Sequence, residues 1–190
     1  MNIVLASASP RRRELMERLG VKNLLVIPAR GEESAPAGLA PEELVKELSR
    51  AKAAEVAAQR PPEDVVIGAD TIVELDGRIL GKPADEKQAA EMLSALSGRE
   101  HRVFTGVTVI KGDEVISQAE MSIVRFRPLD QREIAAYIAT GDPMDKAGSY
   151  GVQGVACLFV SGIQGDYFNV MGLPLCRLGI ILKKLGVELL

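Results

Sequence analysis

The stretch Ile3-Val-Leu-Ala-Ser-Ala-Ser-Pro-Arg-Arg-Arg13 decides the fold, because it passes directly from a buried strand into a helix. Its first three residues are apolar and predict a short strand. Ser9 is a favourable N-cap, and Pro10 suits the first helical position, where its missing N–H costs nothing. We therefore expect a helix that begins at Pro10 and carries three arginines in its first turn.

These arginines lie at the positive end of the helix dipole, where each is unfavourable by roughly 0.3–1 kcal/mol. A bound anion would make the interaction of these arginines with their surroundings favourable. Backbone N–H groups, the hydroxyls of Ser7 and Ser9 and forked guanidinium groups are the donors that a polyphosphate needs. The alternative is a solvated basic helix start, and we interpret Arg13 in this way. Arg11 and Arg12, together with the two serines, are interpreted as an anion site.

Composition bounds the class of protein. With 190 residues, 47% of them hydrophobic, the chain can form a substantial core. A single domain over residues 1–190 is expected, with two lobes around a central cleft as a variant. The net charge of −3 and the pI near 5.4 argue against stable nucleic-acid binding. No stretch approaches the ~20 apolar residues of a membrane span, and the first residues lack a basic region before their apolar run. We therefore expect a cytoplasmic protein without membrane contact.

The cysteines and the single histidine exclude further classes. Cys157 and Cys176 lack metal-ligand spacing and have apolar neighbours, which predicts buried, reduced thiols. His101 is the only histidine, which disfavours zinc hydrolase chemistry and a histidine-based triad. Because His101 stands between charged residues at a strand start, we expect it to be exposed and incidental.

Hydrophobic periodicity predicts the remaining elements. We expect strands over residues 24–28, 65–67, 103–109 and 115–126, and hairpins over residues 72–80 and 156–170. Helices are expected over residues 41–59, 129–139 and 174–184, and another follows Pro83 and closes at Gly98. This mixture predicts an α/β or α+β fold around a mostly antiparallel or mixed sheet.

Polar residues interrupt these segments at residues 7–12, 32–33, 70–71 and 142–153, and such interruptions are typical of sites. Asp70 lies at the expected end of a buried strand, where an aspartate is more often a site residue than a turn cap. Lys52 falls in the middle of the apolar arc of its helix. The loop over residues 141–154 has a length that usually serves binding or catalysis.

The residue types in these clusters suit a metal-bound polyphosphate. Glu33 and Asp70 offer hard oxygen ligands for Mg²⁺ or Mn²⁺, while Lys52 and Lys82 add positive charge. An aspartate with a pKa of about 3.9 is a weak base toward bulk water, so activation of the water by a metal ion is the more credible route. We therefore expect absolute metal dependence.

Each residue also has a purely structural interpretation. A solvated loop explains Glu32 and Glu33 equally well, and half-buried lysines such as Lys52 commonly extend their ammonium group to solvent. Lys82 fits a turn before a proline, and nothing in the spacing of Gln153 distinguishes it from a surface residue.

Eight motifs follow one another along nearly the whole chain. They are Leu5-Ala-Ser-Ala-Ser-Pro-Arg-Arg12, Glu32-Glu-Ser34, Gly68-Ala-Asp-Thr71, Gly81-Lys-Pro83, Leu96-Ser-Gly98, Gly141-Asp-Pro-Met-Asp-Lys-Ala-Gly148, Tyr150-Gly-Val-Gln-Gly154 and Gly165-Asp-Tyr-Phe-Asn-Val-Met-Gly-Leu-Pro174. In this set and order the chain resembles the Maf-like nucleotide pyrophosphatases, also called septum-formation-inhibitor-like proteins.

The resemblance implies an α/β fold, with a mixed sheet flanked by helices, similar to the inosine triphosphate pyrophosphatases. It also implies hydrolysis of nucleoside triphosphates to the monophosphate and pyrophosphate with Mg²⁺ or Mn²⁺, and it suggests a homodimer. Asp70 matches the catalytic base of the family. The phosphate and metal site is matched by Ser7, Arg12, Glu33, Lys52 and Lys82, and the positions that separate substrate subgroups by Arg11, Thr71 and Gln153.

Within the family, the Asp-Lys-Ala-Gly and Gly-Val-Gln-Gly runs resemble the subgroup acting on dTTP and UTP, with removal of non-standard or modified nucleotides as the expected role. The subgroup acting on 7-methyl-GTP ranks second, because Arg11 replaces its usual bulky residue. Glu32 replaces the usual aspartate of the acidic triplet, which leaves its role as a ligand open.

The mechanism expected from these residues is cleavage between the α- and β-phosphates by a water that Asp70 orients or deprotonates. Two rivals are a regulator of cell division that binds nucleotide without turnover, and a nucleotidyl or phosphoryl transferase. The transferase needs an acceptor, and Walker-type Gly-Lys-Ser/Thr sequences are absent.

Overall fold

The computed structural model describes residues 1–21, 23–31, 35–36 and 38–189. They divide into two compact units. The first unit comprises Met1–Asp70, Thr105–Glu120 and Gly172–Leu190, and the second comprises Thr71–Phe104 and Met121–Met171. None of the helices in the described ranges is both long and apolar enough to cross a membrane.

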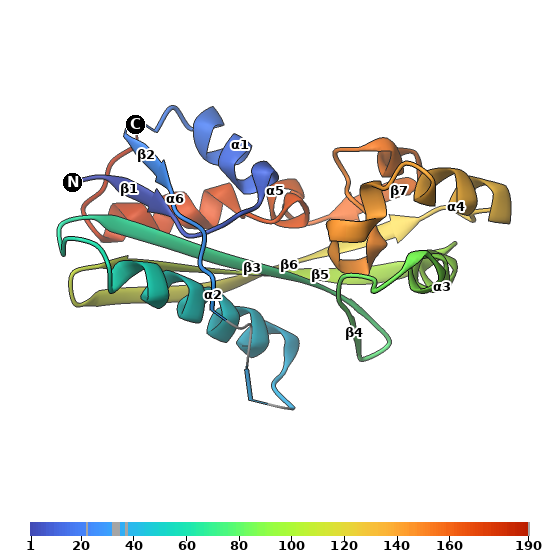
Figure 1. Ribbon diagram of the computed structural model, residues 1–190, viewed down its shortest axis with the longest axis horizontal. Helices are drawn as coiled ribbons and strands as arrows, with labels where there is room; N and C mark the ends of the chain where they lie inside the picture. Colours follow the sequence, from blue (N-terminus) through green and yellow to red (C-terminus); the bar gives the residue numbers. More distant parts are fainter. Residues whose placement is uncertain (22, 32–34, 37, 190) are drawn as a thin grey trace. The chain divides into compact units, whose positions relative to one another are not determined.

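The strands of the described residues form a mixed sheet in the order β2-β1-β3-β5-β6-β7, with β4 paired to β3 (Figure 1). β1 pairs in parallel with both β2 and β3, whereas β4 is antiparallel to β3 and β7 to β6. The predicted mixed sheet flanked by helices is thereby confirmed. The strand bounds are β1 Ile3–Leu5, β2 Leu24–Val26, β3 Val65–Leu75, β4 Arg78–Leu80, β5 Glu100–Lys111, β6 Glu114–Phe126 and β7 Val160–Gln164.

The first unit contains α1 (Pro10–Arg18), α2 (Pro41–Ala57) and α6 (Leu175–Lys184). Helices α1 and α2 cover opposite faces of its part of the sheet (Figure 1). The predicted helix start is confirmed, because α1 begins at Pro10 and the Ser9 hydroxyl accepts a hydrogen bond from the Arg12 backbone N–H at 3.5 Å. The chain passes from β1 through α1 to β2 on one side, and then through α2 to β3 on the other.

Two glycines let α2 lie directly on the sheet. A Cβ atom at Gly106 in β5 would stand 2.0 Å from the Val45 carbonyl oxygen, and one at Gly68 in β3 would stand 2.4 Å from that of Ser49. Only glycine permits backbone to approach backbone this closely. The buried Ser49 and Thr108 hydroxyls join across the same interface at 2.8 Å. The position of α2 is therefore fixed by contact with two strands.

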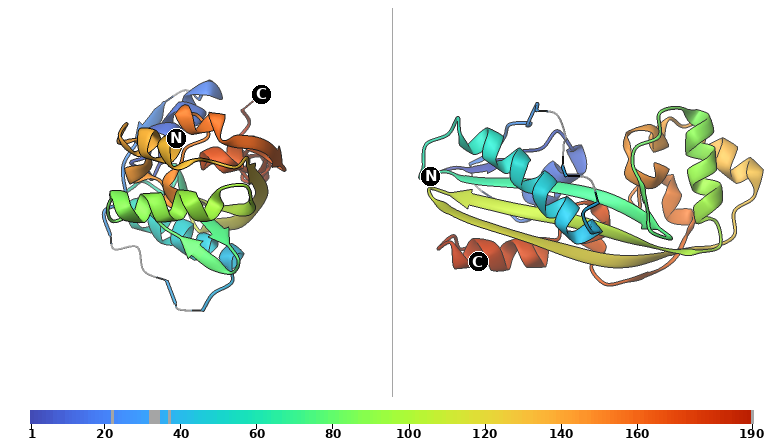
Figure 2. Two further views of the ribbon diagram at one scale, coloured as in Figure 1. Left: turned by 90° about the vertical axis from the view of Figure 1, so that its right-hand side faces the viewer. Right: turned by 90° about the horizontal axis from the view of Figure 1, so that it is seen from below.

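The second unit contains α3 (Glu86–Leu96), α4 (Gln131–Ile138) and α5 (Tyr167–Met171), with 3₁₀ turns η1 (Asp142–Asp145), η2 (Ala147–Ser149) and η3 (Val155–Leu158). Helices α3 and α4 pack against each other (Figure 2). Their apolar faces enclose an aromatic core in which the rings of Phe126 and Phe159 are buried.

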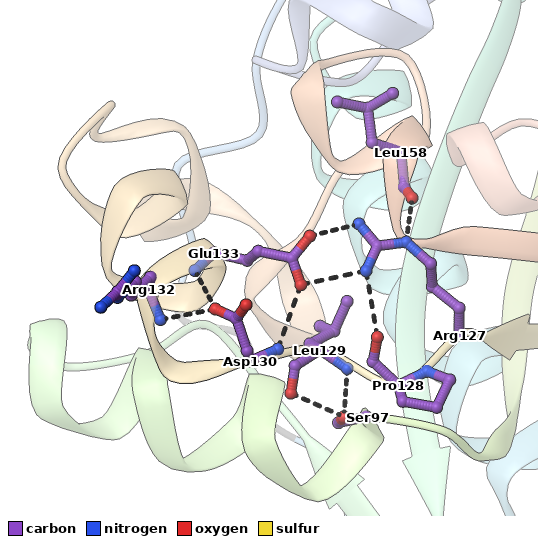
Figure 3. A network of polar contacts seen from close by, with 8 residues as sticks. All are labelled: Ser97, Arg127, Pro128, Leu129, Asp130, Arg132, Glu133 and Leu158. Atoms are coloured by element: carbon purple, nitrogen blue, oxygen red, sulfur yellow. Dashed lines mark hydrogen bonds and ion pairs between the residues drawn. The ribbon is translucent and has the colours of Figure 1, made fainter.

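A polar network closes the start of α4 (Figure 3). Asp130 and Glu133 form a capping box, and the Arg127 guanidinium donates to both carboxylate oxygens of Glu133 at 3.0 and 2.6 Å. Arg127 also donates to the Leu158 carbonyl oxygen at 2.9 Å. The hydrogen bonds from Arg127 and from the Asp130 backbone lower the pKa of Glu133 to about 2. The network ties the start of α4 to η3.

Two element predictions are wrong. Asp70 does not end a strand, because β3 runs unbroken to Leu75; Gly68 marks the contact with α2 rather than a break. Residues 156–170 do not form a hairpin, since only β7 is a strand there. The Asp166 carboxylate accepts from the Phe168 backbone N–H at 2.7 Å, and this turn starts helix α5.

Two burial predictions are also wrong. His101 is only 2% exposed, because β5 already begins at Glu100 and strand alternation directs His101 inward. Cys157 and Cys176 are exposed. Cys157 lies in the turn η3 beside the exposed Val155 and Leu158, so apolar neighbours in sequence did not indicate burial.

Replacing Gly106 with alanine should destabilise the fold by about 1–3 kcal/mol or more, because the new methyl group collides with α2 backbone that has nowhere to retreat. Urea unfolding measures this as a lower midpoint at unchanged slope. Gly162→Ala in β7 is the matched control, since a Cβ there meets nothing within 4 Å. Equal midpoints for the two variants would contradict the close approach of α2.

The buried His101 should weaken the protein in mild acid. Burial lowers its pKa to about 4 in the folded chain, against about 6.5 when unfolded. Between these values the unfolded chain binds the proton more readily, so stability falls as the pH drops below 6.5 and the loss is complete near pH 4. The loss attributable to His101 is on the order of 3 kcal/mol. Unfolding midpoints from pH 7 to 4 should decline less steeply in His101→Phe; parallel curves would refute this assignment.

Candidate functional site

Asp70 and Lys52 form an ion pair in the first unit. Asp70 lies within β3 and Lys52 within α2, and the Lys52 ammonium donates to Oδ1 of Asp70 at 2.5 Å. The side chains are only 10% and 17% exposed, respectively. The lysine in the apolar arc of α2 therefore has a partner on the strand, instead of extending to solvent. The contact fixes the carboxylate of Asp70 in one place.

Glu55, one turn beyond Lys52 on α2, is a residue that sequence reasoning missed. Its carboxylate accepts hydrogen bonds from the backbone N–H groups of Arg30 and Gly31 at 2.7 and 2.9 Å. These bonds lower the pKa of Glu55. Its spacing of three residues from Lys52 places both on one helix face, and this was the available signal. The segment held by Glu55 leads in sequence to Glu32 and Glu33, which lie outside the described residues.

Hydrogen bonds at the N-terminus of α1 join Ser7 and Arg12. The Ser7 hydroxyl accepts from the Ser9 backbone N–H at 3.2 Å and from Nη1 of Arg12 at 3.3 Å. Nε of Arg12 donates to the Gly172 carbonyl oxygen at 2.7 Å. Arg11 is half-buried, whereas Arg13 is exposed and pairs with a glutamate one turn along. Arg12 is thus oriented by the fold, and Arg13 is a surface residue.

Strand register places the end of β1 beside the part of β3 that leads to Asp70. Leu5 of β1 pairs with Ile67 of β3, and the Ala6 N–H donates to the Ile67 carbonyl oxygen at 2.8 Å. Continuing this parallel register takes Ser7 alongside the residue before Asp70. The spot lies beyond the carboxyl end of β1, where the chain connections diverge to the two sides. In open α/β sheets, ligands bind at such switch points.

The second unit holds the remaining predicted residues. Thr71 follows Asp70 in β3 and is partly exposed, Lys82 is exposed after β4, and Gln153 is partly exposed between η2 and η3. The Gly81 carbonyl oxygen accepts from the Gly148 N–H at 3.0 Å. This bond links the segment of Lys82 to the loop over residues 141–154.

The charged side chains of the loop over residues 141–154 form ion pairs with one another. The Lys146 ammonium donates to the Asp142 carboxylate at 2.9 Å and to that of Asp145 at 2.7 Å, and it is almost fully buried. Lys146 also donates to the Asp142 carbonyl oxygen at 2.5 Å. The loop therefore uses these charges to hold its own shape.

The donor set suits a divalent ion only in part. In the part of the chain that the structure describes, no three carboxylate, histidine or cysteine residues gather as metal ligands. Mg²⁺ is commonly held by one or two carboxylates together with substrate phosphates and waters. Asp70 can supply one such carboxylate; the other predicted ligand, Glu33, lies outside the described residues.

A model of the Maf-like proteins matches residues 2–185. A dTTP/UTP pyrophosphatase of Symbiobacterium thermophilum is 47% identical over 184 residues, which cover 97% of this chain and 94% of the relative. A protein of the same name from Pelotomaculum thermopropionicum is 50% identical over 190 residues, with 99% and 98% covered.

Among solved structures, a HAM1 protein from Coxiella burnetii matches with a TM-score of 0.53 at 15% identity, covering 97% of this chain and 99% of the other. This likeness concerns the fold, whereas the sequence matches extend over nearly the whole chain. The chain belongs to the family of Maf-like proteins.

Proposed function

We propose that this protein hydrolyses nucleoside triphosphates, preferring dTTP and UTP, to the nucleoside monophosphate and pyrophosphate. The observation that carries the proposal is the identity of 47–50% over nearly the whole chain to relatives named dTTP/UTP pyrophosphatase. The geometry of the first unit supports it, because the carboxylate of Asp70 lies within β3 and the anion donors follow β1, the strand that pairs with β3 in parallel.

The triphosphate is bound by the N-terminus of α1, the Ser7 hydroxyl and the Arg12 guanidinium. Gly172 and Ser7 hold Arg12 before substrate arrives, so little side-chain freedom is lost on binding. The negative phosphates also remove the unfavourable interaction between the arginines and the helix dipole. Lys52 and Lys82 add positive charge toward the outer phosphates.

Asp70 orients the attacking water and accepts its proton. The water oxygen forms a bond to the α-phosphorus, the bond from that phosphorus to the bridging oxygen breaks, and pyrophosphate leaves with the electron pair. Lys52 keeps the Asp70 carboxylate in one position through Oδ1. Positioning and charge stabilisation supply most of the rate enhancement.

We also propose Mg²⁺ or Mn²⁺ as the cofactor, held by Asp70 and, as the family resemblance implies, by Glu33. When bound, such an ion neutralises phosphate charge and lowers the pKa of a bound water. Base selection is assigned to Arg11, Thr71 and Gln153. The Gln153 amide can donate to and accept from the edge of a pyrimidine.

Asp70→Asn should reduce kcat for UTP by at least about 10²-fold, because the amide cannot take up the proton of the water. Pyrophosphate release in the presence of Mg²⁺ measures this, with urea unfolding to verify the fold. Asp113→Asn, at an exposed turn of the same unit, is the matched control and should retain wild-type kcat. A wild-type protein that binds UTP without releasing pyrophosphate would instead indicate a binding regulator.

Gln153→Ala should reduce the differences in kcat/KM among the nucleoside triphosphates. With the amide removed, kcat/KM should fall for UTP and dTTP more than for CTP and GTP, by roughly 2- to 10-fold for one hydrogen-bonding group. Steady-state kinetics on the four triphosphates measures the ranking, and an unchanged order with unchanged ratios would reject Gln153 as a reader of the base.

A further inference from the structure

The hydroxyl of Tyr137 joins two distant points of the loop over residues 141–154. It donates to Oδ2 of Asp142 at 2.7 Å and accepts from the Gly151 backbone N–H at 3.3 Å. The Tyr137 ring is buried and lies edge-on to Phe159, with 5.3 Å between the centroids. The position of the hydroxyl is therefore set by the core of the second unit.

The segment of Gly151 to Gly154 is a tight turn that packs on the same group. The Gly154 N–H donates to the Gly151 carbonyl oxygen at 3.1 Å. A Cβ atom at Gly151 would stand 2.7 Å from Cε of Lys146, and one at Gly154 would stand 2.9 Å from Oδ2 of Asp142. The turn thus rests directly on the Asp142–Lys146 ion pair.

Gln153 lies inside this turn. The preceding Val152 is buried, whereas Gln153 itself is partly exposed. A residue between two such closely packed glycines has few backbone positions open to it. The place of its amide group consequently depends on whether the turn stays against Asp142.

We infer that Tyr137 is a positioning residue for base selection, whose hydroxyl holds the turn over residues 151–154 against Asp142 and so sets the place of Gln153. The inference deepens the proposed function and rests on the role given there to Gln153. The proposed function gives Tyr137 no part in the phosphate chemistry, so its loss acts on selection among bases rather than on bond cleavage.

Burial in this place also keeps the hydroxyl in its donor form. Desolvation and, next, the hydrogen bond to Asp142 raise the pKa of Tyr137 far above its ordinary value. The Tyr137 hydroxyl therefore stays protonated, and able to donate to Asp142, throughout the pH range near neutrality.

Tyr137→Phe removes the hydroxyl and keeps the ring in the core. The first measurement is amide hydrogen exchange of the wild type and the variant. Exchange at Gly151 should be faster by roughly 2- to 10-fold, the value of one hydrogen bond. Unchanged exchange at Gly151 would overturn the positioning role, whatever the protein's activity.

The second measurement is kcat/KM for UTP, dTTP, CTP and GTP in the wild type, Tyr137→Phe, Gln153→Ala and the double variant. Tyr137→Phe should reduce the preference for UTP over GTP by a similar 2- to 10-fold, through KM for UTP and with little change in kcat. In the double variant the Tyr137 change should have no further effect on the ranking, because the two residues act through one contact.

Ser97→Ala is the matched control for lost stability. Ser97 bonds to the backbone of Leu129 near the other end of α4 (Figure 3), so its loss should lower stability without altering the ranking. An altered ranking in Ser97→Ala, or additive effects in the double variant, would refute the inference. If Gln153→Ala leaves the ranking unchanged, the role of Gln153 in the proposed function fails and the selection part of the inference fails with it. Exchange at Gly151 still reports on the contact itself.

Discussion

The seating of α2 on the sheet determines most of what the first unit can do. Gly68 and Gly106 leave no side chain between the helix backbone and the strands, so α2 has a single depth and a single rotation about its axis. With that rotation fixed, Lys52 reaches Asp70 and, one turn on, Glu55 reaches the backbone at residues 30–31. One packing contact thereby places an ion pair on the strand and anchors the segment that leads to the acidic residues.

The start of α1 shows a complementary use of local structure. Arginines in the first turn are unfavourable next to the helix dipole, and this cost persists in the protein without a ligand. The Arg12 guanidinium donates hydrogen bonds to Gly172 and Ser7, and these bonds keep it ordered. β1, which leads into this helix, pairs in parallel with β3, the strand that carries Asp70. The anion donors and the carboxylate therefore belong to segments of two neighbouring strands that run in the same direction.

The sequence predicted those elements that depend mainly on neighbouring residues. The strand, the cap and the proline at the start of α1 could be predicted from the sequence. The unusual position of Lys52 within the apolar face of its helix could be predicted as well. The errors arose where tertiary contacts override local signals. Gly68 suggested a break because its reason, the approach of α2, comes from residues about 20 positions away. His101 and the cysteines were misjudged because burial depends on strand register and on the face of a helix, neither of which follows from neighbours in sequence.

The loop over residues 141–154 shows why a cluster of charges is a poor guide to which residues meet a ligand. The polar residues over positions 142–153 suggested a binding loop, yet Lys146 is almost fully buried and its ammonium bonds to both Asp142 and Asp145. Ions paired in this way stabilise a backbone shape, and their attraction for a ligand is correspondingly reduced. The proposed function assigns recognition in this loop to an uncharged side chain, that of Gln153, on the closely packed turn over residues 151–154. A neutral amide suits this task, because discrimination between bases depends on hydrogen-bond direction, and direction is defined only where the backbone is held still.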